Sequence, residues 1–170
     1  WQIPPIAKVE LKGKLRTGVT GKDVIIALCG FFNHDEVLNH AIEFVGDGIK
    51  QLAIDQRLTI ANMTTEWGAM AGVFPIDEVT IDWLKSRARF ISLRGLERVT
   101  SDIDGNGIHP RMNKKRIAEL EKDIQNLKTD TDAFFSKELT IDLSSIEPHV
   151  SGPNTVKTMT SISEIKEKKV

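Results

Sequence analysis

Residues 7–30 read AKVELKGKLRTGVTGKDVIIALCG and join a strand pattern to a helix pattern. From Ala7 to Leu15 apolar and polar residues alternate, which predicts a strand with one buried face. A glycine-containing turn follows, and Thr20 within it is suited to cap a helix that we expect from Lys22 to Cys29. The stretch therefore predicts one β–α unit.

Strand patterns and helix patterns alternate along the chain to about residue 90. Further strands are expected at Ala41–Val45, Val73–Phe74 and Leu139–Leu143, and helices at Asp35–Asn39, Asp55–Met70, Asp77–Ala88 and Lys114–Leu127. The stretch from Leu93 to Asn113 is rich in glycine and has few periodic apolar positions, so we expect a loop there. Strands that alternate with helices predict an α/β fold with a largely parallel sheet.

Composition excludes several classes of protein. The chain has 170 residues, 40% of them hydrophobic and 28% charged, which is typical of a globular protein. A net charge of −1 favours neither nucleic acid nor an anionic membrane as a partner, and no apolar stretch is long enough to span a bilayer. Cys29 is the only cysteine, so a disulfide or a cysteine-ligated cluster within the chain is not expected. The start at Trp1, without a methionine or a presequence, leads us to expect an internal segment of a longer protein.

Three weak signals for other sites favour ordinary structural roles. Residues 102–107 read DIDGNG and match the opening of a calcium loop, but the twelfth position is Asn113 instead of glutamate, so a polar surface turn is favoured. The histidines, which are His34, His40, His109 and His149, have no spacing typical of metal ligands. Cys29 ends an apolar helix with no neighbouring cation, which favours a buried, inert thiol.

The most informative segment is residues 58–69, LTIANMTTEWGA. Asn62 and Glu66 are one turn apart on the expected helix, so both side chains leave the same face. An amide beside a carboxylate can hold a polar ligand or a water molecule. The neighbouring residues are small and apolar, unlike an ordinary solvated face, although the spacing alone does not decide between a site and a surface pair.

The same segment resembles the aconitase/isopropylmalate dehydratase superfamily. Asn62-Met63-x-x-Glu66-x-Gly68-Ala69 matches the family's Asn-Met-x-x-Glu-x-Gly-Ala run. Further resemblance lies in residues 19–25 (VTGKDVI), 40–46 (HAIEFVG) and 150–154 (VSGPN), and it is strongest to the fungal homoaconitases.

The resemblance implies a hydro-lyase that hydrates a tricarboxylic acid, cis-homoaconitate, at a [4Fe-4S] cluster in which one iron acts as a Lewis acid. Glu66 would be the catalytic residue of this chain, hydrogen-bonded to the water or hydroxyl at the open iron, and Asn62 would lie near cluster and substrate. The cluster ligands, the serine base and the substrate arginines would lie outside the chain. We therefore expect no metal ligand here and no activity from the chain alone.

The resemblance also implies a three-layer, mostly parallel α/β fold like the second aconitase domain. We expect that domain over residues 1–90, a loop and polar helix connection over 91–137, and the start of the following domain over 138–170, as a C-terminal extension. The parent would act in lysine biosynthesis by the aminoadipate route in the mitochondrial matrix, with its remaining domains as partners. Aconitase, the large subunit of isopropylmalate dehydratase and a non-catalytic binding or scaffolding module remain alternatives.

Overall fold

The computed structural model describes residues 2–94, 109 and 111–165. The chain forms two compact units: unit 1 comprises residues 1–74 and 132–170, and unit 2 comprises residues 75–131. Strand β4 (Lys137–Asp142) belongs to unit 1, where it pairs with the first strand of the chain.

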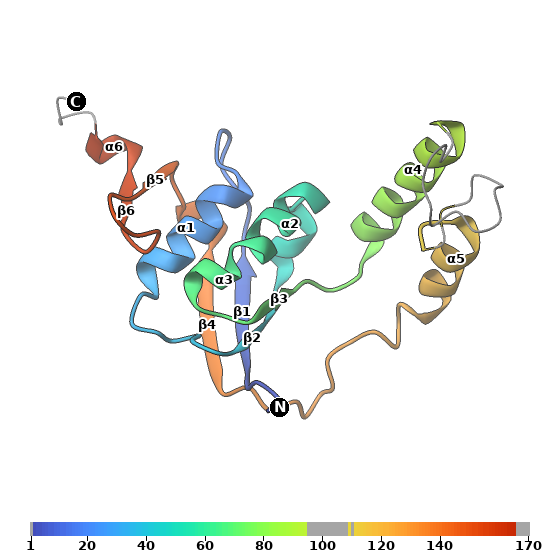
Figure 1. Cartoon of the computed structure of the whole chain (residues 1–170), viewed down its shortest axis with the longest axis horizontal. Helices are drawn as coiled ribbons and strands as arrows, with labels where there is room; N and C mark the ends of the chain where they lie inside the picture. The colour runs from blue at the N-terminus through green and yellow to red at the C-terminus, as the bar shows by residue number, and fades with distance from the viewer. Residues whose placement is uncertain (1, 95–108, 110, 166–170) are drawn as a thin grey trace. The chain divides into compact units, whose positions relative to one another are not determined.

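A four-stranded sheet is the centre of unit 1 (Figure 1). Its strands are β1 (Ile6–Lys12), β2 (Ala41–Val45), β3 (Ala71–Val73) and β4, in the order β3-β2-β1-β4. Every pairing in this sheet is parallel, with Val9 opposite Phe44 on one side and Leu139 on the other. The predicted α/β fold with a mostly parallel sheet is therefore confirmed.

Three helices of unit 1 pack on one face of this sheet, as Figure 1 shows. They are α1 (Gly21–Phe31), α2 (Ile54–Asn62) and α3 (Thr64–Trp67), with a short 3-10 helix, η1 (Asp47–Gln51), before α2. The opposite face carries charge: Lys8 pairs with Glu138 on β4, and Lys12 pairs with Glu10. Within the described residues of unit 1, these helices thus form one layer against the sheet.

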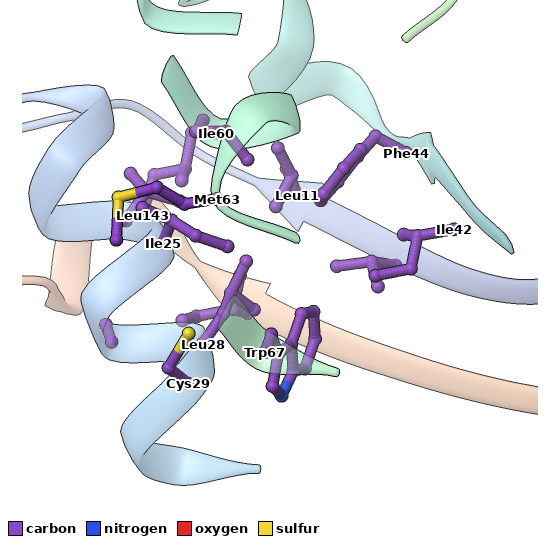
Figure 2. Close-up of a cluster of buried hydrophobic side chains, with 14 of the residues drawn as sticks. Leu11, Ile25, Leu28, Cys29, Ile42, Phe44, Ile60, Met63, Trp67 and Leu143 are labelled. Atoms are coloured by element: carbon purple, nitrogen blue, oxygen red, sulfur yellow. The ribbon is translucent and has the colours of Figure 1, made fainter. Parts of the chain in front are cut away.

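The core of unit 1 lies between the sheet and these helices. Alternation along β1 turns Ala7, Val9 and Leu11 inward, where each is fully buried. Figure 2 shows Leu11, Ile42 and Phe44 of the strands facing Ile25, Leu28 and Cys29 of α1. Trp67, Ile60 and Met63 close the core from the α2–α3 side. Apolar burial of this extent is the main source of the stability of unit 1.

Helix α1 begins at a capped turn, as the sequence predicts. The backbone N–H and the hydroxyl of Thr20 both donate to the Asp23 carboxylate, each at 2.8 Å. The second oxygen of Asp23 accepts from the backbone N–H of His149 at 2.9 Å. Asp23 is 8% exposed, so this one carboxylate joins the start of α1 to a segment distant in sequence.

That distant segment is the C-terminal part of unit 1. It contains a 3-10 helix η2 (Leu143–Ser145), strands β5 (His149–Ser151) and β6 (Met159–Ser161), which pair antiparallel, and α6 (Ile162–Ile165). Met159 packs against Gly30 of α1, and the Lys157 ammonium lies 2.8 Å from the Asp35 carboxylate. The segment therefore packs on α1.

Residues 35–39 form turns where we expected a short helix, so that prediction is wrong. Asp35 and Asn39 have φ angles of 61° and 60°, which is the left-handed region and is incompatible with a continuous right-handed helix. The backbone bonds Leu38 N–H to Asp35 O and His40 N–H to Val37 O close these turns instead.

Unit 2 contains two helices in its described part, α4 (Glu78–Arg94) and α5 (Lys114–Asp123). Asn113 caps α5 through its side-chain oxygen, which accepts from the N–H of Arg116. Ile81 and Ile117 are the buried hydrophobic residues among those described. The possible calcium loop at 102–107 lies outside the described residues. None of the described helices has the length and apolarity needed to cross a bilayer.

Candidate functional site

The segment that carries Asn62 and Glu66 is two helices instead of the single one expected. Helix α2 ends at Asn62, Met63 has φ −89° and ψ 6°, and α3 then begins at Thr64. The Thr64 hydroxyl donates to Ala61 O at 2.8 Å, and the Thr65 hydroxyl lies 3.2 Å from Asn62 O. The Thr64 hydroxyl thus occupies a carbonyl, Ala61 O, that a continuous helix would use, and side-chain bonds of this kind often bend helices. Asn62 and Glu66 therefore do not lie on one face of a continuous helix, as we expected.

Trp67 anchors α3 to the rest of unit 1. Its side chain is 1% exposed, and its indole N–H donates to Phe32 O, at the end of α1, at 2.7 Å. The Phe32 and Trp67 rings lie 6.2 Å apart in a tilted arrangement. Gly68 follows with φ 105° and ends the short helix in the left-handed conformation. Trp67 and Gly68 therefore fix the end of the short helix that carries Glu66.

Asn62 and Glu66 nevertheless line the same hollow. Both side chains are exposed to solvent, and the hollow is open, with a volume of about 730 Å³. The Glu66 carboxylate accepts a hydrogen bond from the Thr65 hydroxyl at 2.7 Å. The residues that line the hollow are Lys22, Leu58, Thr59, Ala61, Asn62, Met63 and Glu66. An amide, a carboxylate and an ammonium thus meet beside apolar carbon atoms, a combination that suits an acidic organic ligand.

Cys29 lies in the core below this segment. Burial raises the pKa of the Cys29 thiol to about 11, with a further contribution from the Glu66 carboxylate. Lys157 and Lys22 act in the opposite direction on the same pKa. A thiol with this pKa stays protonated near neutral pH, and the thiolate is the form that binds metals and attacks electrophiles. The structure therefore supports the interpretation of Cys29 as a buried, inert thiol.

The other predicted polar residues do not assemble into a site. His34 is exposed, His40 Nδ1 lies 2.8 Å from Leu38 O, and His109 Nδ1 accepts from the N–H of Met112. In the described ranges no group of three or more His, Cys, Asp or Glu residues is arranged to hold a metal ion. The described residues therefore provide no set of ligands for an iron–sulfur cluster.

Lys22 is the lining residue that sequence reasoning did not identify. Its ammonium lies 2.9 Å from the sulfur of Met63, across the hollow's edge, and it comes from a different helix than Asn62 and Glu66. Lys22 is 40 positions from Asn62 in the sequence, so no local spacing could pair them. Only the packing of α1 against α2 brings the two together.

Comparison with known proteins decides the family. The sequence profile of the aconitase family (aconitate hydratase) matches residues 1–170. The chain belongs to the aconitase family. Enzymes of the aconitase family typically use an iron–sulfur cluster, whereas the described residues of this chain supply no ligand set for one. The resemblance stated from residues 62–69 and the segments around them is confirmed.

Similar aconitase-family proteins come from fungi. "Homoaconitase, mitochondrial" of Candida parapsilosis is 54% identical over 165 residues, which is 97% of this chain and 22% of that protein. The proteins of the same name from Yarrowia lipolytica and Mycosarcoma maydis are 54% and 52% identical over the same shares. The chain thus spans about a fifth of the length of these curated relatives. The similarity to fungal homoaconitases expected from the sequence is also confirmed.

Proposed function

We propose that this chain is a segment of a homoaconitase, a hydro-lyase that converts cis-homoaconitate and water into homoisocitrate. The reaction adds the hydroxyl of water to one carbon of the double bond and a proton to the other. The observation that carries this proposal is identity of 52–54% over 97% of the chain to three proteins named homoaconitase. The names of these relatives also support a mitochondrial location for the parent protein. We propose that it acts in lysine biosynthesis.

Glu66 is the proposed catalytic residue of the chain. Its carboxylate is exposed in the hollow, where it can accept a hydrogen bond from the hydroxyl or water that is removed or added. The neighbouring Thr65 hydroxyl and the anchored Trp67 hold the turn that carries it. Asn62, the last residue of α2, has one amide donor group and one acceptor. We propose that its side chain orients the same ligand.

The [4Fe-4S] cluster of the parent protein is proposed to be held by cysteines outside this chain. Cys29 is fully buried and its pKa is raised to about 11, so it is not a candidate ligand. The proposed partners of this segment are the remaining domains of the same polypeptide and the tricarboxylic acid itself. We propose further that the residues after β4 lead into the next domain. On this account the chain alone neither holds a cluster nor turns over substrate.

A substrate comparison tests this proposal. The full-length protein that contains this segment, with its cluster reconstituted without oxygen, is assayed with cis-homoaconitate, cis-aconitate and isopropylmalate. The proposal predicts the highest kcat/KM with cis-homoaconitate. A preference for cis-aconitate or isopropylmalate would contradict it and assign the protein to another branch of the family. Absence of all three activities in a cluster-loaded protein would favour a non-catalytic role.

A further inference from the structure

The hollow contains a cation that the proposed mechanism has not used. Lys22 is the second residue of α1, one position before the capping residue Asp23, and its side chain is exposed. A cation in the first turn of a helix is disfavoured by the helix dipole. A contribution to the stability of α1 therefore does not explain why a lysine is found at this position. The side chain lines the hollow, where it can contact a ligand.

The contacts of Lys22 leave most of its hydrogen-bonding capacity unused. Its ammonium has three N–H donors, and one of them points at the Met63 sulfur at 2.9 Å. A thioether is a weak acceptor. Among the described residues no carboxylate lies within ion-pair distance of this ammonium. Because the side chain is exposed in the hollow, the remaining donors are available to a ligand there.

Lys22 and Glu66 also act on the same buried group. The Glu66 carboxylate raises the pKa of Cys29, and the Lys22 ammonium lowers it. Both charges are therefore close enough to Cys29 to affect its pKa, and both residues line the hollow. Met63, which the ammonium touches, is 6% exposed and lies at the break between α2 and α3. The packed core thus holds the contact partner of the ammonium in place.

We propose that Lys22 binds a carboxylate of the ligand that enters this hollow, beside Asn62 and Glu66. The three polar groups match a hydroxy acid: the ammonium takes a carboxylate, and the amide and the Glu66 carboxylate face the hydroxyl. Leu58 and Ala61 supply the apolar lining for its carbon chain. The assignment of this ligand as the substrate rests on the proposed function, whereas the carboxylate site itself rests on the hollow.

The first test uses the full-length enzyme. Lys22→Met removes the charge and retains an unbranched chain, so KM for the tricarboxylate should rise about tenfold or more while kcat changes by less than about twofold, the pattern of lost ground-state binding. Lys22→Arg should recover most of the affinity. Lys50→Met, an exposed lysine of η1 outside the hollow, is the matched control and should leave KM unchanged. An unchanged KM in Lys22→Met, or a changed kcat with unchanged KM, would overturn the proposal.

The second test is independent of turnover and uses the 170-residue chain. The chain has four methionines, so methyl-labelled protein gives a simple NMR spectrum in which the Met63 methyl reports on the hollow. Addition of tricarballylate, a tricarboxylate without a hydroxyl, should shift the Met63 signal in the wild type and in Lys22→Arg but not in Lys22→Met. No shift in the wild type, or an equal shift in Lys22→Met, would contradict the proposal. Failure of the substrate comparison with success here would reject the proposed function and retain the carboxylate site.

Discussion

Two pairs of side chains in the α2–α3 segment have the same spacing and opposite surroundings. Met63 and Trp67 are 6% and 1% exposed, whereas Asn62 and Glu66, each one position earlier, are exposed to solvent. The buried pair closes the core of unit 1, and the exposed pair lines the hollow. The stabilising pair and the pair with the proposed chemical role are therefore adjacent in one segment, and substitutions can separate their effects.

The largest expected loss of stability comes from the buried pair. Trp67→Ala removes a fully buried ring and should lower the free energy of unfolding by about 3–5 kcal/mol. Trp67→Phe keeps most of the apolar volume but loses the hydrogen bond to Phe32 O, so it should cost less, about 1–3 kcal/mol. Urea unfolding followed by circular dichroism measures both. A Trp67→Ala variant within about 1 kcal/mol of the wild type would contradict the anchoring role.

The close backbone contact between α1 and α2 comes next. A Cβ at Gly21 would lie 2.7 Å from the backbone oxygen of Gln56, so Gly21→Ala forces α1 and α2 apart and should cost about 1–3 kcal/mol. Gly30→Ala is the matched control in the same helix, since there the new Cβ meets the flexible side chain of Met159. It should cost less in the same unfolding experiment. Equal costs would show that the α1–α2 contact is not restrictive.

The buried thiol below the segment predicts a dependence on pH. Burial raises the pKa of Cys29 from its ordinary value of 9.0 to about 11, so above pH 9 the unfolded chain releases a proton that the folded chain retains. Stability should therefore be unaffected by this group below about pH 9 and fall by up to about 1.4 kcal/mol per pH unit as the pH rises toward 11. The difference between the wild type and Cys29→Ala, measured by urea unfolding at several pH values, isolates the effect. A constant difference from pH 8 to about 11 would contradict it.

The smallest effect on stability is expected at the exposed pair. Asn62→Ala and Glu66→Gln remove no buried contact and should change the free energy of unfolding by less than about 0.5 kcal/mol. The Thr65 hydroxyl retains an acceptor in the glutamine variant. Unfolding curves of both variants, compared with Trp67→Ala, give the contrast directly. A loss above about 1 kcal/mol at either position would mean that the two pairs do not divide the roles as described.

Local patterns predicted the parts of this structure that depend on local causes. The alternation from Ala7 onward predicted β1, and Thr20 predicted the start of α1, because a pleated strand and a helix cap are each set by neighbouring residues. The break at Met63 was missed because a count of apolar positions does not register the hydrogen bond from the Thr64 hydroxyl to Ala61 O.

Contacts between distant residues could not be predicted in this way. The pairing of β4 with β1 joins positions 130 apart, so the sequence offered no reason to place Lys137–Asp142 in the first sheet. Lys22 reaches the hollow through helix packing for the same reason. Asn62 and Glu66 were identified because a motif of eight residues, 62–69, contains both. The expectation of one continuous helix through both residues was wrong.

The most direct test of the central claim is the turnover of the full-length enzyme with Glu66→Gln. If the carboxylate contacts the hydroxyl or water of the reaction, kcat should fall by about 100-fold or more, while the folded state and the cluster absorbance remain those of the wild type. Asp55→Asn, which replaces another exposed acid on the same segment outside the hollow, should retain wild-type turnover. A Glu66→Gln enzyme with a full cluster and undiminished kcat would show that this segment does not contribute a catalytic group.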